Sequence, residues 1–191
     1  IQLLKRYRHY RQYQKLLKYR KYSRYGADFR SIARIKEYIK DCIYLIVLRV
    51  FYIFPIKKNR VMFMSFEAGK YACNPRRISE YLAKNYPDDV EIIWAFKGAN
   101  NFRWLADWGV SKTVEYGMRI PAMIPFRKKQ TTIGTGHGGG AYKKLLLDNP
   151  SIRTSDQKIQ ELSASHTDIL VSSCKYYTKY VVRGAFAHKG E

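Results

Sequence analysis

The sequence has few acidic residues relative to its basic ones. Fifteen Asp and Glu stand against 36 Lys and Arg among 191 residues, which gives a formal net charge of +21. The first 60 residues hold 17 of the cations but only Asp28, Glu37 and Asp41, so this third carries +14 and the remainder carries +7. Such a segment favours a polyanionic partner, namely an acidic membrane surface, a nucleic acid or a phosphate-rich polymer.

Cysteine and long apolar runs are also scarce. Cys42, Cys73 and Cys174 are odd in number, far apart and form no C-x-x-C pair, which favours reduced cytosolic thiols over a disulfide framework or a zinc site. The longest apolar run, residues 42–55, has fourteen residues and falls short of the ~20 that span a bilayer. No early apolar region of a signal peptide is present. Because the chain begins with Ile1 and ends at Glu191, we expect a fragment of a longer protein.

Residues 1–25 alternate tyrosine with lysine and arginine. This composition suits a helix at a membrane interface, with rings at headgroup level and cations on anionic lipid. Stacking on single-stranded nucleic acid would use the same residue types, and a solvated basic helix with half-packed tyrosines is an equal alternative. The tyrosines are Tyr7, Tyr10, Tyr13, Tyr19, Tyr22 and Tyr25.

A second helix is predicted from a cap at Asp28 or Ser31 to about Phe54. Its apolar residues keep a spacing of three and four, which defines one face. We expect monotopic attachment, with this face in lipid and Lys57, Lys58 and Arg60 on the headgroups. The residues of the face are Ile32, Ile35, Ile39, Cys42 or Ile43, Ile46, Val50 and Ile53.

Strands and helices alternate after about Arg60, which predicts a parallel sheet with ligands at the carboxyl ends of its strands. The alternation fails between Gly117 and Gln130. Asn74 and Pro75 are predicted as the N-cap and first residue of a helix. The inner faces are predicted to hold Ile78, Tyr81 and Leu82 in one helix, and Tyr177, Tyr180 and Val181 in another. The expected strands are 61–64, 91–96, 112–115, 130–133 and 168–171, and the expected helices are 76–86, 102–108, 155–163 and 174–186.

The stretch from Gly134 to Lys144 places one histidine among glycines and ends with two lysines. Five glycines in the seven residues 134–140 indicate unusual backbone dihedrals or close approach of a ligand. A strand, a Gly-rich loop and a helix together form an anion-binding arrangement. His137 is placed to act as a general base, although a hydrogen bond to a neighbouring loop or a simple tight turn would also explain the pattern. The spacing matches neither a Walker A loop nor a dinucleotide fingerprint.

Several strings in order resemble the CDP-glycerol glycerophosphotransferase family of teichoic acid primases and polymerases. They are Arg60-Val-Met-Phe-Met-Ser-Phe, Gly69-Lys-Tyr-Ala-Cys-Asn-Pro75, Glu80-Tyr-Leu82, Trp94, Gly136-His-Gly-Gly-Gly-Ala-Tyr-Lys-Lys144 and the segment 168–190. The resemblance implies the N-terminal Rossmann-like half of a GT-B architecture. It also implies a helix and strand after Gly117 that this chain lacks, and a donor-binding half that is absent.

The composition and apolar spacing predict a basic, membrane-associating helical segment over residues 1–58, and the resemblance implies an acceptor-side catalytic half over 59–191. The activity would be transfer of glycerol phosphate from CDP-glycerol to a lipid-linked acceptor at the cytoplasmic membrane face, with no cofactor or metal and no nucleic acid. The chain alone is predicted to be inactive. The alternative is a non-enzymatic module that binds nucleic acid or anionic membrane through its basic arm.

The expected site residues follow the resemblance. His137 would be the catalytic base, and phosphate or acceptor would be held by Gly138, Gly139, Lys143, Lys70, Asn74 and Arg76. For Asn74 a capped helix start is a sufficient explanation. His9, His166 and His188 are expected to be ordinary histidines, because the sequence alone does not indicate what they would contact. Glycerol versus ribitol phosphate, primase versus polymerase, and a homo-oligomeric state are left open.

Overall fold

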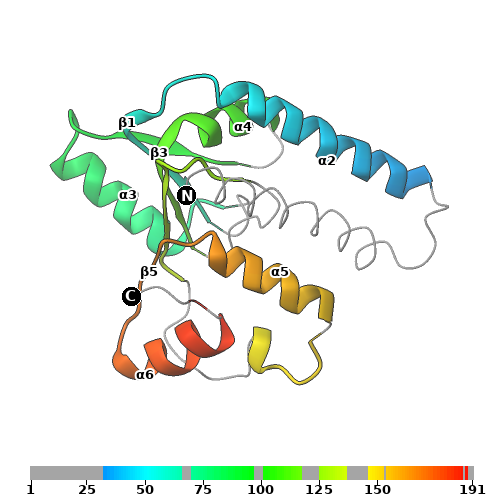
Figure 1. Ribbon diagram of the computed structural model, residues 1–191. Coiled ribbons are helices and arrows are strands. Elements are labelled where there is room, and N and C mark those ends of the chain that lie inside the picture. Colours follow the sequence, from blue (N-terminus) through cyan, green and yellow to red (C-terminus); the bar gives the residue numbers. More distant parts are fainter. Residues whose placement is uncertain are drawn as a thin grey trace.

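Five parallel strands form the centre of the computed structural model (Figure 1). The model describes residues 32–65, 70–96, 101–117, 125–136, 146–152, 154–186 and 188. The tyrosine-rich predictions for residues 1–25 and the caps at Asp28 and Ser31 lie outside these residues.

The strands are β1 (Lys57–Met64), β2 (Glu91–Trp94), β3 (Ser111–Tyr116), β4 (Thr131–Gly134) and β5 (Ile169–Leu170). Their order in the sheet is β2-β1-β3-β4-β5, and every neighbouring pair is parallel. The parallel sheet predicted from the alternating pattern is therefore confirmed. Short apolar runs marked β1, β2 and β5 in the sequence, as is common for strands buried on both faces, whereas β3 (SKTVEY) and β4 (TTIG) contain several polar residues.

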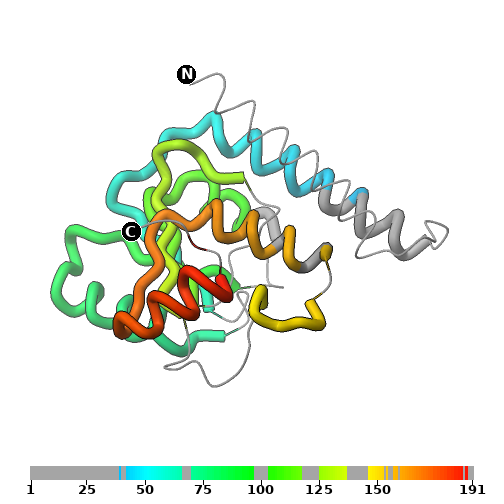
Figure 2. Tube along the Cα trace, turned by 60° about the horizontal axis from the view of Figure 1, so that its bottom comes forward, coloured from blue at the N-terminus to red at the C-terminus, as the bar shows by residue number. Residues whose placement is uncertain are grey.

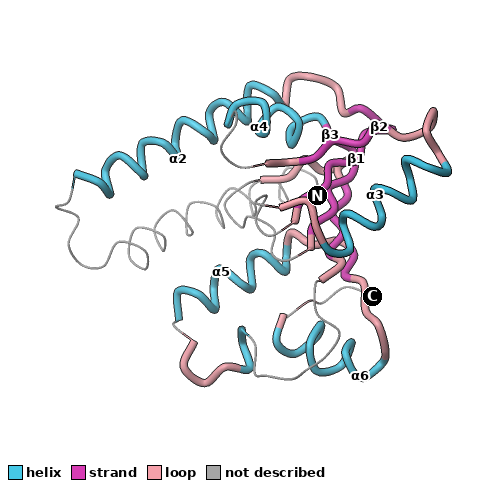
Figure 3. Tube along the Cα trace, turned by 180° about the vertical axis from the view of Figure 1, so that it is seen from behind, coloured by secondary structure: helices cyan, strands magenta, loops and turns pink. Residues whose placement is uncertain are grey.

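Helices lie on both sides of these strands. They are α2 (Ile32–Phe51), α3 (Cys73–Asn85), α4 (Asn101–Val110), α5 (Thr154–Ser165) and the short α6 (Lys175–Tyr177), which continues as a π-helix η2 (Thr178–Ala185). Figure 3 shows α2 and α4 on one side of the strands and α3 on the other. A 3-10 helix η1 (Leu146–Asp148) contacts both α5 and η2 (Figure 2).

The main hydrophobic core lies between the sheet and the pair α2 and α4. Leu48 of α2, Leu105 and Trp108 of α4, and Met62 and Val114 of the sheet are all fully or almost fully buried. The end of α2 is thus part of the α/β body. No helix within the described part of the chain is long and apolar enough to cross a membrane.

The resemblance implied that a helix and a strand are missing after Gly117. The sheet is nevertheless continuous at this point. β3 pairs directly with β4, with Thr113 opposite Thr131 and Tyr116 opposite Gly134. Phe126, in the described end of the connection, packs on Trp108 with ring centroids 4.7 Å apart. Gln130 then joins two elements, because its Nε2 donates to the carbonyls of Trp108 and Ser111 at 2.6 and 2.9 Å.

The predicted inner faces of two helices are partly wrong. In α3 the buried residues are Pro75 and Ser79, whereas Ile78 and Tyr81 are exposed. In the C-terminal helix Val181 is buried as predicted, but Tyr180 is exposed. The side of α3 that faces the sheet carries the compact side chains of Pro75 and Ser79. A search for apolar residues at helical spacing does not find such a face.

Candidate active site at the carboxyl edge of the sheet

The carboxyl ends of β1, β3 and β4 bring three chain segments together. The chain leaves β1 toward β2 on one side and leaves β3 toward β4 on the other, and such a reversal creates a crevice where ligands bind. Backbone hydrogen bonds continue past the strands, from Gly117 N to Met64 O at 3.0 Å and from Thr135 N to Tyr116 O at 3.0 Å.

Asn74 fastens the start of α3 to the segment after β4. Its Nδ2 donates to the carbonyls of Thr135 at 3.0 Å and Gly136 at 3.1 Å. The prediction that Asn74 is an N-cap is wrong, because the N-cap is Ala72 and no side chain caps the helix. Pro75 is the third residue of α3, where its missing N–H costs nothing, since the first four N–H groups have no partner within a helix. Asn74 therefore holds the entry to the Gly-rich loop.

Glycines permit this close approach of backbones. A Cβ on Gly117 would lie 3.1 Å from Pro75 Cγ, and one on Gly134 would lie 2.5 Å from Leu170 Cδ1 and 2.7 Å from the Tyr116 hydroxyl. Gly136 has a φ of +65°, in the left-handed region that favours glycine. The glycines predicted to serve an unusual backbone do so at the described start of the loop.

Glu115 is a buried carboxylate in the centre of this edge, and the sequence analysis did not single it out. Its register neighbours Phe63 and Ile133 surround it with apolar surface, and its exposed fraction is 3%. Thr135 Oγ1 donates to Glu115 Oε1 at 2.5 Å, while Oε2 has no hydrogen-bond partner among the described residues. Burial raises the pKa of Glu115 to about 7, against the opposing effect of the Thr135 bond.

Ser65 adds a second unsatisfied group at the same edge. It follows the last residue of β1, is 1% exposed, and its Oγ has no partner within the described part of the chain. A buried hydroxyl normally finds a partner, so these two side chains mark the edge as polar and available. In the sequence, Glu115 lies within one predicted strand and Ser65 directly follows another. Neither position had any other feature that pointed to a site.

Lys70 and Arg76 flank the same helix start. Lys70 is exposed in the segment before α3. Arg76 Nε donates to Glu80 Oε1 at 2.7 Å, which is the main reason that the pKa of Glu80 lies below its ordinary value. The Arg76 guanidinium also lies over the Tyr71 ring, 5.3 Å from its centroid. Tyr71 in turn meets Trp94 edge-on at 4.5 Å, so a cationic and aromatic surface borders the crevice.

The structure brings together only part of the predicted site. Asn74 reaches the loop entry, and Lys70 and Arg76 lie at the same end of α3. His137, Gly138, Gly139 and Lys143 lie outside the described residues. No group of three or more His, Cys, Asp or Glu that could hold a metal ion is found among the residues that the structure describes. The three cysteines are unpaired.

A parallel sheet of this order, with a Gly-rich segment at its carboxyl edge, defines a Rossmann-like half-domain that binds ligands at the strand ends. The model of the CDP-Glycerol:Poly(glycerophosphate) glycerophosphotransferase family matches residues 46–191. The chain belongs to this family, as the ordered strings in its sequence predicted.

Curated relatives and solved structures agree with this assignment. A teichoic acid poly(glycerol phosphate) polymerase of Bacillus spizizenii is 30% identical over 169 residues, covering 77% of this chain and 42% of the relative. A protein of the same name from Bacillus subtilis is 28% identical over 150 residues, covering 68% of this chain and 20% of the relative. The chain thus spans less than half the length of these relatives.

The wall teichoic acid polymerase TagF has the same fold over the matched region. One TagF structure gives a TM-score of 0.65 at 21% identity, covering 82% of this chain and 45% of TagF. A histidine-to-asparagine TagF variant with CDPG gives 0.65 at 22% identity, covering 78% and 44%. The predicted α/β class and its GT-B relationship are confirmed.

Proposed function

We propose that this chain provides the acceptor-side half of an enzyme that transfers glycerol phosphate from CDP-glycerol to a hydroxyl of a lipid-linked polymer. The family match across the whole α/β region, Gly-rich loop included, carries this proposal. Both curated relatives are named for poly(glycerol phosphate), which favours glycerol over ribitol and a polymerase over a primase.

In this mechanism His137 takes the proton of the acceptor hydroxyl as the oxygen attacks the β-phosphorus of CDP-glycerol. The new phosphodiester bond forms while the bond from that phosphorus to the bridging oxygen breaks, and CMP leaves with the electron pair. Such a transfer depends on positioning and charge neutralisation more than on covalent catalysis. The loop amides and Lys143 would neutralise charge, and Asn74 would hold the loop entry through Gly136. We propose that no metal takes part.

Release of CMP tests this function directly. The complete protein, in which this half is joined to a donor-binding half, is expected to release CMP from CDP-glycerol only when a lipid-linked acceptor is present. Residues 1–191 alone are expected to release none. If the complete protein leaves CDP-glycerol intact with every polyol-phosphate acceptor, the proposal is wrong.

We also propose that α2 holds the protein on an anionic membrane at its cytoplasmic face. One side of α2 is in the core through Leu48. The opposite side, continued by Ile53 two residues after the helix ends, exposes a stripe with spacing of four and three, and the exposed fractions of Ile46 and Ile53 reach 64% and 81%. Such a stripe next to basic residues fits the headgroup boundary. It comprises Ile39, Ile43, Ile46, Val50 and Ile53, with Arg49 and Lys58 exposed nearby.

Vesicle flotation should reveal this attachment. The chain is expected to float with phosphatidylglycerol vesicles and less with neutral phosphatidylcholine vesicles, because both apolar burial and charge contribute. The double substitution Ile46→Ser and Ile53→Ser should lower the partition coefficient about 100-fold or more, since burial of each isoleucine contributes roughly 1.5–3 kcal/mol and each 1.4 kcal/mol is a factor of about ten.

A matched control is the double substitution Ile78→Ser and Tyr81→Ser, which removes two exposed apolar side chains from α3 and should leave flotation unchanged. If the chain ignores anionic vesicles but retards single-stranded RNA at about 150 mM salt, where weak electrostatic binding fades, the nucleic-acid alternative replaces the membrane proposal.

A further inference from the structure

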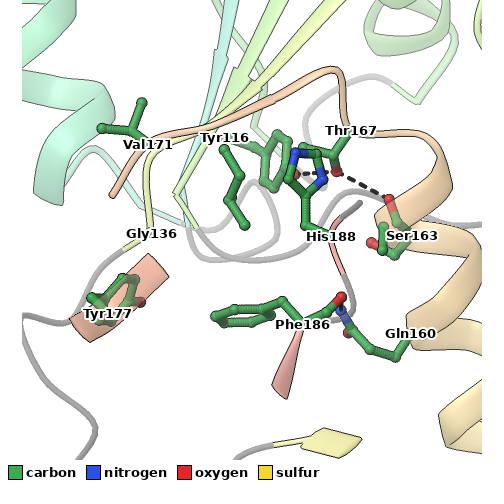
Figure 4. Close-up of a pocket in the computed structure, with 11 residues that line it drawn as sticks. Tyr116, Gly136, Gln160, Ser163, Thr167, Val171, Tyr177, Phe186 and His188 are labelled. Atoms are coloured by element: carbon green, nitrogen blue, oxygen red, sulfur yellow. Dashed lines mark hydrogen bonds between the residues drawn. The ribbon is translucent and has the colours of Figure 1, made fainter. Parts of the chain in front are cut away.

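A pocket with a mainly apolar lining lies beside the crevice, between the ends of β4 and β5, helix α5 and the C-terminal helix (Figure 4). Gly136 lines it on the side of the Gly-rich loop, and Tyr177 lines it from α6. In Figure 4, His188 and Thr167 lie at one end of the pocket and Tyr177 at the other. Nothing in the proposed transfer mechanism uses this space.

His188 is the feature of the pocket that lacks an explanation. It is only 4% exposed, yet neither Nδ1 nor Nε2 has a hydrogen-bond partner within the described part of the chain. Gln160 is similar. Its Nε2 donates to the Phe186 carbonyl at 3.1 Å, and this bond leaves the buried Oε1 without a partner. Because buried polar atoms are normally paired, three such atoms on two lining side chains indicate a polar occupant.

Two other polar side chains of the pocket, Tyr116 and Thr167, are already hydrogen-bonded. Thr167 Oγ1 donates to the Ser163 carbonyl at 3.0 Å, so its contact with the Tyr116 hydroxyl at 2.5 Å requires Tyr116 to be the donor. Burial raises the pKa of Tyr116 to about 12, which keeps that proton in place at neutral pH. Among the described residues that line the pocket, the buried polar atoms without a hydrogen-bond partner therefore belong to His188 and Gln160.

These atoms select a class of ligand. A neutral imidazole offers one donor and one acceptor, and Gln160 Oε1 is a second acceptor. A hydroxyl both donates and accepts, so two adjacent hydroxyls satisfy all three atoms. A phosphate would bring negative charge into the pocket, and none of the described residues that line it is a lysine or arginine that could neutralise this charge.

We propose that this pocket is a binding site for a small polyol, with His188 and Gln160 as its hydrogen-bonding residues. The polyol is either a free small molecule or the hydroxyl-bearing end of an acceptor polymer. The second source rests on the proposed function, whereas the site itself does not.

Ligand titration of the 191-residue chain tests the site. With labelled histidine, the His188 ring resonance, identified by its loss in His188→Phe, is expected to shift saturably with glycerol. It should not shift with 1-propanol, which lacks two of the hydroxyls, or with inorganic phosphate. Gln160→Leu should weaken glycerol binding about tenfold through the loss of one acceptor. Gln157→Leu, at an exposed position one turn earlier in α5, should not.

Ala164→Leu keeps both polar side chains and fills the pocket, so it should also weaken glycerol binding if either polar variant fails to fold. Tighter binding of a glycerol phosphate dimer than of glycerol would identify a polymer end, and equal binding a free polyol. Ordered water alone would give no saturable shift. That result, or equal binding by 1-propanol or phosphate, overturns the assignment. CDP-glycerol is absent throughout, so failure of the transfer activity would leave this result unaffected.

Discussion

Replacement of His137 by alanine is expected to lower the rate of glycerol phosphate transfer by the complete protein about 10²- to 10⁴-fold, the usual loss when a general base is removed. The acceptor hydroxyl is a poor nucleophile while protonated, and the imidazole removes its proton during attack. Initial rates of CMP release at saturating CDP-glycerol measure the effect.

The matched control is His9→Ala, because His9 lies outside the family match over residues 46–191. It should retain the rate of the parent protein. A parent-like rate for His137→Ala with unchanged thermal unfolding would remove His137 from catalysis and leave only a structural role for the loop.

Glu115 is expected to make the folded protein less stable as the pH rises from about 4.5 to 7. The pKa of Glu115 is about 7 in the folded chain, against an ordinary 4.5. The unfolded chain loses its proton first, so in this window it binds fewer protons than the folded chain and stability falls with rising pH. The full difference corresponds to roughly 3 kcal/mol.

Denaturant unfolding between pH 4.5 and 8 measures this slope. Glu115→Gln keeps an oxygen to accept from Thr135 Oγ1 but has no titrating proton, so its free energy of unfolding should be flatter across the window. Glu161→Gln, at an exposed position of α5, is the control and should keep the parent slope. An unchanged slope in Glu115→Gln would show that the carboxylate is solvated or paired.

The order and kind of the elements could be predicted because each depends on a local pattern. The predicted strands agree with the observed ones to within a few residues, and the alternation of strands with helices predicted a parallel sheet. The Gly-rich stretch was also visible locally, since unusual dihedrals leave a compositional trace. The family resemblance then identified the family, which the residue types alone could not do, and led to the proposed substrate class.

Other features depend on contacts between distant segments. Asn74 looked like a helix cap, but its donors reach carbonyls about sixty residues further along the chain. The enclosure of His188 was not visible in the sequence, because α5 and the carboxyl edge, which line its pocket, come together only in the fold. The burial of Glu115 likewise follows from Phe63 and Ile133 on neighbouring strands. The residue pattern of a single helix or strand cannot predict burial that depends on other elements.

The packing of α2 has a consequence for geometry. Leu48 is fixed in the same core as Val114, on the strand that ends at the crevice, while Ile46 on the same helix is exposed. A helix that joins core and surface in this way cannot tilt without moving the strands. If its outer side lies on lipid, the distance from the bilayer to the carboxyl edge is set by the fold and not by a flexible tether. An acceptor that grows from the membrane would then meet the crevice at a constant height.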